Sequence, residues 1–487
     1  MAGAAIIALV ICLQACSSSS APSRQAAGAA TPAPDRLLRI GFGLPSGDAG
    51  TSGVRQAARI LSVEGLISFS RNGRPQPWLA DRWDVAPDGR SLTVHLKPGL
   101  RFHDGRALDA ATAQEALRTQ LPSYMGPAFS DISAITATAP LSLQIQLTRR
   151  SNFVLESLDA GLTSPGAPDA GTGPFRLAEK GADDILALEA FPEYRDGAPT
   201  IPRVEFHAYG SERAAWADML RGDVDVLYEV NTEALQSLQP SSQAAFYAHP
   251  RNYAYVLLMN VQRPALADRR VRRQLNDAID RRQLVDETLS GRGRPVDSPV
   301  PPEHWAALPD DGAARFGYHP TPLGSPLTLT CIFADPSLER MAIAVQRQLR
   351  QVGVELTLER IPIDQVYARA TSGQFDLLLA DMLAGPTMAR QQWFFGSGAQ
   401  FNWGHYQNAD VDRAFETMRG AASDPEYQGG VASYARAILA DPPAVFLAWS
   451  ERTRAVSTRY SVPVEPGRDV LSTLRQWRTS DAESVAY

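Results

Sequence analysis

The chain has 487 residues, long enough for two to four structural units, and a formal net charge of −6. Hydrophobic residues account for 44% and charged residues for 21%, which excludes a largely disordered chain. The 47 basic residues do not exceed the 53 acidic ones, so the composition does not favour nucleic-acid binding. After the first 15 residues no apolar run reaches the roughly 18 residues of a membrane-spanning helix, which excludes a multi-pass membrane protein.

The first residues have the pattern of a secretory leader. Residues 4–13 form an apolar run that is too short to span a membrane, and it leads into Leu13-Gln14-Ala15-Cys16. This ending resembles a lipobox, which implies that residues 1–15 are a signal peptide and that the thiol of Cys16 carries a lipid. An ordinary secretory signal followed by an incidental cysteine is the alternative. Residues 16–35, rich in Ser, Ala and Pro, are then predicted to be the lipidated cysteine and a flexible tether.

Strand and helix patterns alternate through the first half of the body. The Asp88-Gly89 turn between two alternating runs is a strong signal for a β-hairpin. Residues 161–174 are rich in Gly, Pro, Ser, Thr and Asp, which indicates a loop or a boundary. We expect strands at 37–43, 83–85, 91–96, 141–147, 185–188 and 203–208, and helices at 54–67, 110–121 and 212–221.

The same alternation continues in the second half. Residues 253–260 have the apolar pattern of a central strand, and Cys331 lies in another apolar strand, where we expect a buried, unreactive thiol. The remaining strands are expected at 327–333, 353–360 and 375–380, and the helices near 268–289, 337–352 and 364–372. Alternating strands and helices predict an α/β fold with a substantial parallel sheet.

Short motifs along the chain resemble, in order and spacing, those of the extracellular solute-binding proteins of ABC importers, in the peptide, nickel and opine group. The matching segments are VEGL at 63–66, PWLADRW at 77–83, DGRSLTVHLKPGLRFHDG at 88–105, GTGPF at 171–175, RGDVD at 221–225, the run 260–272 and AIDR at 278–281. These motifs have structural explanations. Gly171 and Gly173 are interpreted as permitting positive φ at the start of a strand, and Asp268 as opening a helix.

The resemblance implies a two-lobed, periplasmic-binding-protein-like α/β fold of type II, in the large peptide-binding class, with an extra subdomain in the first lobe. Lobe I is expected at 36–60, 172–261 and 451–487. The inserted subdomain is expected at 61–171, and lobe II at 262–450.

The implied mechanism is closure of the two lobes around a small solute. The chain is expected to pass between the lobes twice, at hinge residues Met259, Asn260 and Val261 and again at Ala448, Trp449 and Ser450. A solute that contacts both lobes favours the closed form. The closed protein would deliver its solute to the permease subunits of an ABC transporter, outside the cytoplasm in the cell envelope. We expect a monomer that touches the membrane through the lipid anchor only, with no catalytic group, cofactor or resident metal.

The family geometry implies solute contacts in the loop after the first strand and on lobe II near 381–405. Peptide-binding relatives carry an acidic segment similar to ADYPDP there, whereas this chain has Ala384-Gly385-Pro386-Thr387. Arg390 could answer an anionic group, with a solvated surface arginine as the alternative. The aromatic residues could stack on a solute or simply pack in the core. The candidate contacts are Ser46, Asp48, Asp381, Met382, Arg390, Trp393, Phe394, Asn402 and Trp403.

Three alternatives stay open at this point. A lipoprotein hydrolase needs an activated nucleophile, but the sequence has no G-x-S-x-G elbow, and its seven histidines show no H-E-x-x-H spacing. A nickel-chelate or haem-binding uptake protein of the same fold would need histidines facing the cleft. A sensor is disfavoured because no signalling segment is attached.

Overall fold

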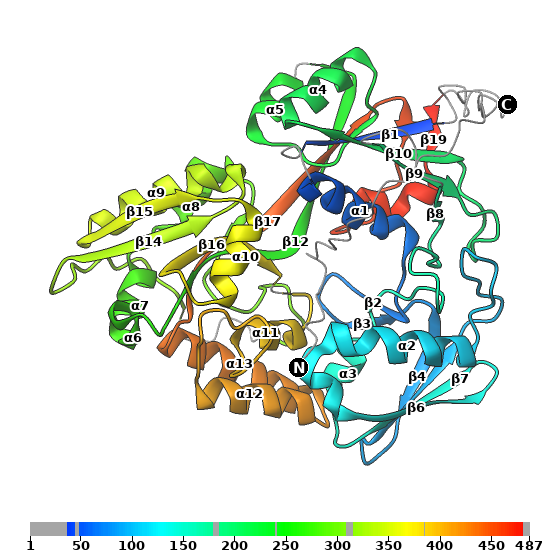
Figure 1. The fold of residues 1–487 in the computed structure, drawn as a ribbon, viewed down its shortest axis with the longest axis horizontal. Coiled ribbons are helices and arrows are strands. Elements are labelled where there is room, and N and C mark those ends of the chain that lie inside the picture. The colour runs from blue at the N-terminus through cyan, green and yellow to red at the C-terminus, as the bar shows by residue number, and fades with distance from the viewer. Residues whose placement is uncertain are drawn as a thin grey trace, which may run out of the picture.

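The computed structural model describes residues 37–43, 48–178, 185–238, 241–307, 315–383 and 385–480. One large mixed sheet runs through both lobes, in the strand order β15-β14-β16-β12-β17-β11-β1-β10-β9-β8, with β13 pairing beside β17. Figure 1 shows lobe I at the top, lobe II at the left and the inserted subdomain at the lower right. The predicted α/β class with two lobes and an extra subdomain is therefore confirmed.

Lobe I is organised around β1, which pairs in parallel with β10 on one side and with β11 on the other. Helix α1 packs on this sheet through Val54, Ala57 and Leu61, in one core with Trp477. The predicted strand at 37–43 and helix at 212–221 match β1 and α4. The elements of lobe I are β1 (Leu37–Gly43), α1 (Asp48–Ser62), β8 (Phe175–Leu177), β9 (Ile185–Ala190), β10 (Arg203–Tyr209), α4 (Glu212–Arg221), β11 (Val226–Leu227), α5 (Thr232–Leu238), β18 (Tyr460–Ser461), η4 (Val470–Gln476) and β19 (Arg478–Thr479).

The inserted subdomain has its own four-stranded antiparallel sheet and its own hydrophobic core. The predicted hairpin is present, with Gly89 at φ +69° in the turn between β4 and β5. The elements are β2 (Ile67–Phe69), β3 (Pro75–Pro77), β4 (Ala80–Val85), β5 (Ser91–Leu96), α2 (Ala110–Met125), η2 (Gly126–Asp131), β6 (Ile132–Ala139), β7 (Ser142–Leu147) and α3 (Asn152–Glu156).

In lobe II the sheet lies between two layers of helices. One sheet face packs with α7, α8 and α9 and buries Cys331, as predicted; the other packs with α11, α12 and α13. The elements are α6 (Pro264–Ala267), α7 (Arg269–Asp277), α8 (Arg281–Leu289), β13 (Arg294–Pro295), β14 (Leu327–Phe333), η3 (Pro336–Leu338), α9 (Glu339–Arg350), β15 (Val354–Arg360), α10 (Ile363–Thr371), β16 (Leu377–Leu383), α11 (Met388–Phe395), α12 (Ala409–Gly420) and α13 (Asp424–Ala440).

Three sequence predictions differ from the structure for local physical reasons. The helix expected at 54–67 spans Asp48–Ser62, because Glu64 already pairs with Leu162 in a β-bridge. The helix expected at 268–289 is two helices, because Asp280 accepts a hydrogen bond from the backbone amide of Gln283 and so caps a new helix start.

The third difference concerns the glycines of the GTGPF motif. Gly171 and Gly173 are not among the glycines that have positive φ. Instead, a Cβ atom on Gly171 would lie 2.0 Å from the carbonyl oxygen of Ser62, and one on Gly173 would lie 2.5 Å from that of Leu61. The glycines are needed because two backbones approach closely at the end of α1.

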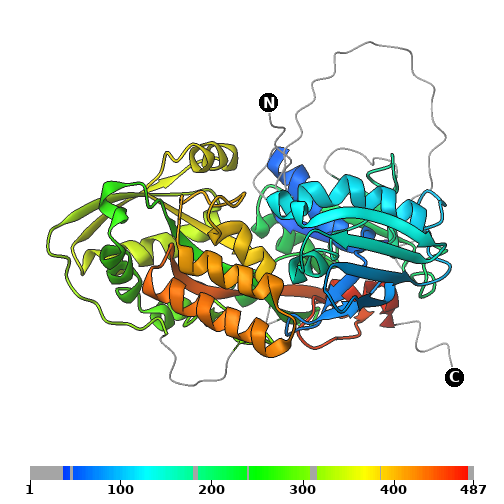
Figure 2. The same cartoon turned by 90° about the horizontal axis from the view of Figure 1, so that it is seen from below.

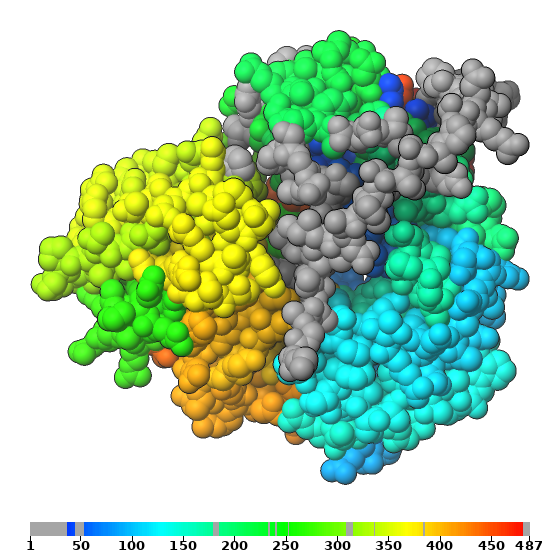
Figure 3. All heavy atoms as spheres, in the orientation of Figure 1, coloured from blue at the N-terminus to red at the C-terminus, as the bar shows by residue number. Residues whose placement is uncertain are grey.

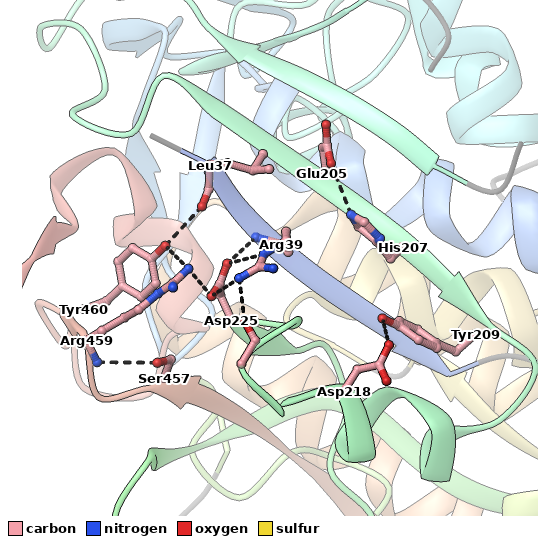
Figure 4. A network of polar contacts seen from close by, with 11 residues as sticks. Leu37, Arg39, Glu205, His207, Tyr209, Asp218, Asp225, Ser457, Arg459 and Tyr460 are labelled. Carbon is pink, nitrogen blue, oxygen red and sulfur yellow. Dashed lines mark hydrogen bonds and ion pairs between the residues drawn. The ribbon is translucent and has the colours of Figure 1, made fainter. Parts of the chain in front are cut away.

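Asp225, the last residue of the RGDVD motif, fastens the first and last parts of lobe I together. Its buried carboxylate accepts hydrogen bonds from the backbone amide of Arg39 at 2.8 Å and from Arg39 Nε at 3.2 Å, and it also pairs with Arg459 (Figure 4). The backbone amide of Ser457 donates to the Asp225 carbonyl at 2.7 Å. One side chain therefore holds β1 against the end of β17.

Replacing Asp225 with Asn should destabilise the protein by roughly 2 kcal/mol, because two arginines lose a buried carboxylate partner. Urea unfolding measures the change. Asp223→Asn is the matched control, since that carboxylate lies two residues away and is 61% exposed. Equal stability of the two variants would show that the Asp225 network contributes little.

Candidate functional site

The two lobes are joined by the antiparallel strands β12 (Ala244–Met259) and β17 (Ala444–Ser457). Residues 244–250 pair with 451–457 beside β11 of lobe I, and residues 254–258 pair with 444–449 beside β16 and β13 of lobe II. The register shifts between Pro250 and Ala254. Figure 2 shows β17 as one long strand that runs from lobe II into lobe I. The passage between the lobes therefore lies near 250–254 and 449–452.

The predicted hinge residues fall on both sides of this position. Ala448, Trp449 and Ser450 lie next to the crossing. Met259 is paired with Leu377 deep in lobe II. Asn260 is buried and donates to the backbone carbonyls of Gly373 and Phe375 at 3.0 and 3.1 Å, and the amide of Val261 donates to the Gly404 carbonyl. The segment 259–261 is thus bound within lobe II, and bending itself stays a prediction.

Arg452 reaches from the crossing into lobe I. Its Nη2 atom lies 3.1 Å from Glu229 Oε2, and its guanidinium carbon lies 5.5 Å from the centre of the Tyr228 ring. Burial opposes the charged form, but the attraction of Glu229 and Tyr228 outweighs it and raises the pKa of Arg452. The buried Nε atom makes no hydrogen bond within the described part of the chain. It is a donor that a bound solute could satisfy.

Arg251 reaches from the same crossing into lobe II. Its Nη1 atom lies 3.0 Å from Asp381 Oδ2, and its guanidinium carbon lies 4.1 Å from the centre of the Tyr253 ring. The arginine side chain is 14% exposed, whereas Asp381 is 40% exposed. Each crossing strand therefore contributes one charge, Arg251 of β12 toward lobe II and Arg452 of β17 toward lobe I.

A second buried pair supports the crossing from the lobe I side. Arg454 Nη2 lies 2.5 Å from Asp469 Oδ2, and the guanidinium carbon lies 3.7 Å from the centre of the Tyr228 ring. Although burial alone would raise the pKa of Asp469, Arg454 holds it at about 2. His249 is nearby, 3.7 Å from Asp469, and burial lowers its pKa to about 4.

Arg390 is neither solvated nor free. It forms an ion pair with Asp159 of the inserted subdomain and donates to the hydroxyl of Tyr124 at 2.8 Å. Burial disfavours its charge, yet Asp159 and Tyr124 raise its pKa above the ordinary value. The Tyr124 ring also meets Trp393 edge to face, with centroids 5.3 Å apart. These contacts join lobe II to the subdomain.

The other predicted contacts on lobe II form part of its packing. Met382 is buried in the lobe II core, and Trp393 is buried where lobe II meets Tyr124 of the subdomain. Phe394 and Trp403 are half-buried around Phe401, at centroid distances of 5.6 and 5.9 Å from it. The side-chain amide of Asn402 donates to the carbonyls of Gly396 and Tyr406 and accepts from the backbone amide of Tyr406. Both its nitrogen and its oxygen are therefore bonded within the loop.

The remaining predicted residues lie outside the described residues or have side chains that are not described. Cys16 and Ser46 lie outside the described residues, and so does the tether at 16–35. Asp48 is the first residue of α1, but its side chain is not described. The role of every predicted contact as a solute ligand stays a prediction.

A surface pocket of about 780 Å³ opens elsewhere, at the start of α8. Asp280, Arg282, Asp286 and Tyr318 are among its lining residues, and all of the lining comes from lobe II. It therefore does not lie between the lobes, and we place the candidate site at the crossing, where charged side chains from both lobes meet.

Sequence reasoning missed the most informative side chains of the site, namely Arg251, Glu229 and Arg452. A usable signal was present for one of them. Arg452 and Arg454 occupy alternate positions directly after the predicted crossing at 448–450, in a strand whose residues 444–449 are all apolar. Charged residues at such a position are expected only where a partner or a ligand compensates the burial.

Among the described residues, no group of three or more His, Cys, Asp or Glu side chains is arranged to hold a metal ion. In the same part of the chain, no helix has the length and apolar character that crossing a membrane requires.

The two-lobed fold is shared with solved structures. The nickel-binding protein NikZ from Campylobacter jejuni, in complex with Ni(L-His), superposes with a TM-score of 0.78 at 18% identity, covering 92% of this chain and 100% of that one. The oligopeptide-binding protein AppA from Bacillus subtilis, in complex with a nonapeptide, gives a TM-score of 0.76 at 18% identity, covering 91% and 99%.

The sequence comparisons establish the family. The description "Bacterial extracellular solute-binding proteins, family 5 Middle" matches residues 74–402. The glutathione-binding protein GsiB of Pectobacterium atrosepticum is 25% identical, covering 88% of this chain and 91% of that protein. The probable D,D-dipeptide-binding periplasmic protein DdpA of Escherichia coli is 24% identical, covering 69% and 71%.

The chain belongs to family 5 of the bacterial extracellular solute-binding proteins. It is the substrate-binding component of an ABC importer, in a family whose members work outside the cytoplasm.

The burial of His249 predicts a loss of stability in mild acid. Its pKa is 6.5 when exposed and about 4 in the folded protein, so between these values the unfolded chain binds the extra proton. The free energy of unfolding therefore decreases as the pH falls from 6.5 toward 4, by at most about 1.4 kcal/mol per pH unit for this group. Urea unfolding of the native protein and of His249→Gln at pH 7 and pH 5 measures the effect.

The free energy of unfolding of His249→Gln should depend less on pH than that of the native protein. His319→Gln is the control, because His319 is exposed and its replacement should leave the native pH dependence in place. If His249→Gln retained the native dependence as well, the burial of His249 would not be what makes the protein acid-sensitive.

Proposed function

We propose that the protein captures a small, charged, peptide-like solute at the lobe crossing and hands it to a membrane permease, without making or breaking a bond. The lobes would bend about residues 250–254 and 449–452. Cys16 would carry the lipid that holds the protein at the membrane. The names of two relatives, a glutathione-binding and a probable D,D-dipeptide-binding protein, support this solute class.

The proposal rests on two ion pairs at the crossing. Arg452 binds Glu229 in lobe I, and Arg251 binds Asp381 in lobe II. A solute with a carboxylate and an ammonium group can exchange with these pairs, because each protein charge then keeps a partner of opposite sign. The free Nε–H of Arg452 adds one hydrogen bond that the protein alone does not make.

The proposal predicts that Arg452→Ala weakens binding of the captured solute about tenfold or more, since a buried hydrogen bond to a charged group is worth about 1.5–3 kcal/mol. A thermal-shift screen of the native protein against glutathione, dipeptides, opines, sugars, nickel–histidine and haem identifies the solute by mass action. Isothermal titration then compares the native protein with Arg452→Ala.

Arg413→Ala is the matched control, because Arg413 is 71% exposed on α12 and should leave affinity unchanged. A neutral sugar as the tightest solute, bound equally by Arg452→Ala, would contradict the proposal.

A further inference from the structure

The short helix α3 of the inserted subdomain packs against helices α11 and α12 of lobe II. Asn152 Nδ2 donates to the carbonyls of Met418 and Ala421, both at 2.9 Å, at the C-terminal end of α12. Glu156 Oε2 accepts from the amide of Ala389 at 3.1 Å, in the first turn of α11. The N-cap residue of α11, Thr387, makes no side-chain capping bond, so α3 supplies what both helix ends lack.

The apolar contact is equally close. Phe153 of α3 is 1% exposed and belongs to the core of lobe II, together with Phe415 and Tyr434 of α12 and α13. The guanidinium carbon of Arg419 lies 5.1 Å from the centre of the Phe153 ring. An aromatic ring of the subdomain therefore completes the interior of another body.

Buried polar pairs flank this contact on both sides. Asp131 of the subdomain pairs with Arg419, with side chains 2% and 5% exposed. Glu156 Oε1 accepts from the hydroxyl of Tyr427 at 2.5 Å, and Asp159 pairs with Arg390 of α11. Separating the two bodies would break all of these contacts. Asp131 would keep Arg149 and Arg419 would keep Glu416, whereas Arg390 would lose its carboxylate partner, which is costly for a buried charge.

The subdomain is also fixed to lobe I. Glu64 Oε2 lies 2.7 Å from Arg195 Nη1, and Glu64 Oε1 accepts from the hydroxyl of Tyr194 at 2.9 Å. The three bodies thus close a ring, with the crossing strands on one side and α3 on the other (Figure 1). In Figure 3 the atoms of the subdomain and of the α12–α13 region meet along the lower edge. If the subdomain stays fixed to lobe I, bending at the crossing must therefore release α3.

We propose that α3 and its docking site on α11 and α12 form a latch that holds the lobes closed, with or without solute. Asn152, Phe153 and Glu156 are positioning residues, since they contact lobe II and hold it against the subdomain. The latch sets the closed fraction of the protein, and the apparent solute affinity scales with that fraction. The effect on affinity rests on the proposed binding of a solute between the lobes.

Small-angle X-ray scattering of the solute-free chain tests the latch without a known solute. The native protein should scatter as the compact, latched form, and Phe153→Ala should have a larger radius of gyration and maximum dimension. Asn152→Ala is the milder variant, which loses two hydrogen bonds but leaves the core intact. Asp410→Asn, in an exposed pair on α12, is the control and should remain compact.

The two proposals fail in different ways. An open native protein, or compact folded variants, would overturn the latch whatever the solute is. If no solute binds, only the capture proposal fails, because scattering still reports the latch. With glutathione or another solute from the screen, a fall in the closed fraction to about one tenth should raise the apparent Kd about tenfold. An unchanged Kd in an opened variant would overturn the role of the latch in affinity.

Discussion

The structure depends on the antiparallel ladder between β12 and β17. These strands belong to both lobes at once, and each lobe adds its own strands to opposite ends of the ladder. The register shift between Pro250 and Ala254 removes regular pairing where the lobes meet. A sheet is stiff along its hydrogen-bonded ladder, so a break in the ladder is the place where two halves can rotate without disturbing either core.

Charge at this position has two consequences. Arg251 and Arg452 bring cations out of water, and each is stabilised by a carboxylate from a different lobe. Pairs of this kind add little stability compared with apolar packing, and the proposed charged solute would exchange with them. The aromatic neighbours Tyr228 and Tyr253 hold both guanidinium groups in place.

Local patterns predicted local structure well. The strand at 327–333 and the helix at 212–221 match the observed β14 and α4, because apolar periodicity and the Ser211 cap are properties of neighbouring residues. The GTGPF motif was recognised, but its physical role was misassigned, since the close approach of Gly171 to Ser62 depends on residues 109 positions apart, a separation that no local pattern encodes. The same limit applies to Arg452 with Glu229 and to Asp131 with Arg419, whose partners meet only in the folded chain.

The measurement that tests the account most directly is a crystal structure grown with the solute that most raises the melting temperature. The account predicts density for that solute between the lobes, within hydrogen-bonding distance of Arg251 or Arg452. Density in the pocket at the start of α8, with the crossing unchanged, would contradict it.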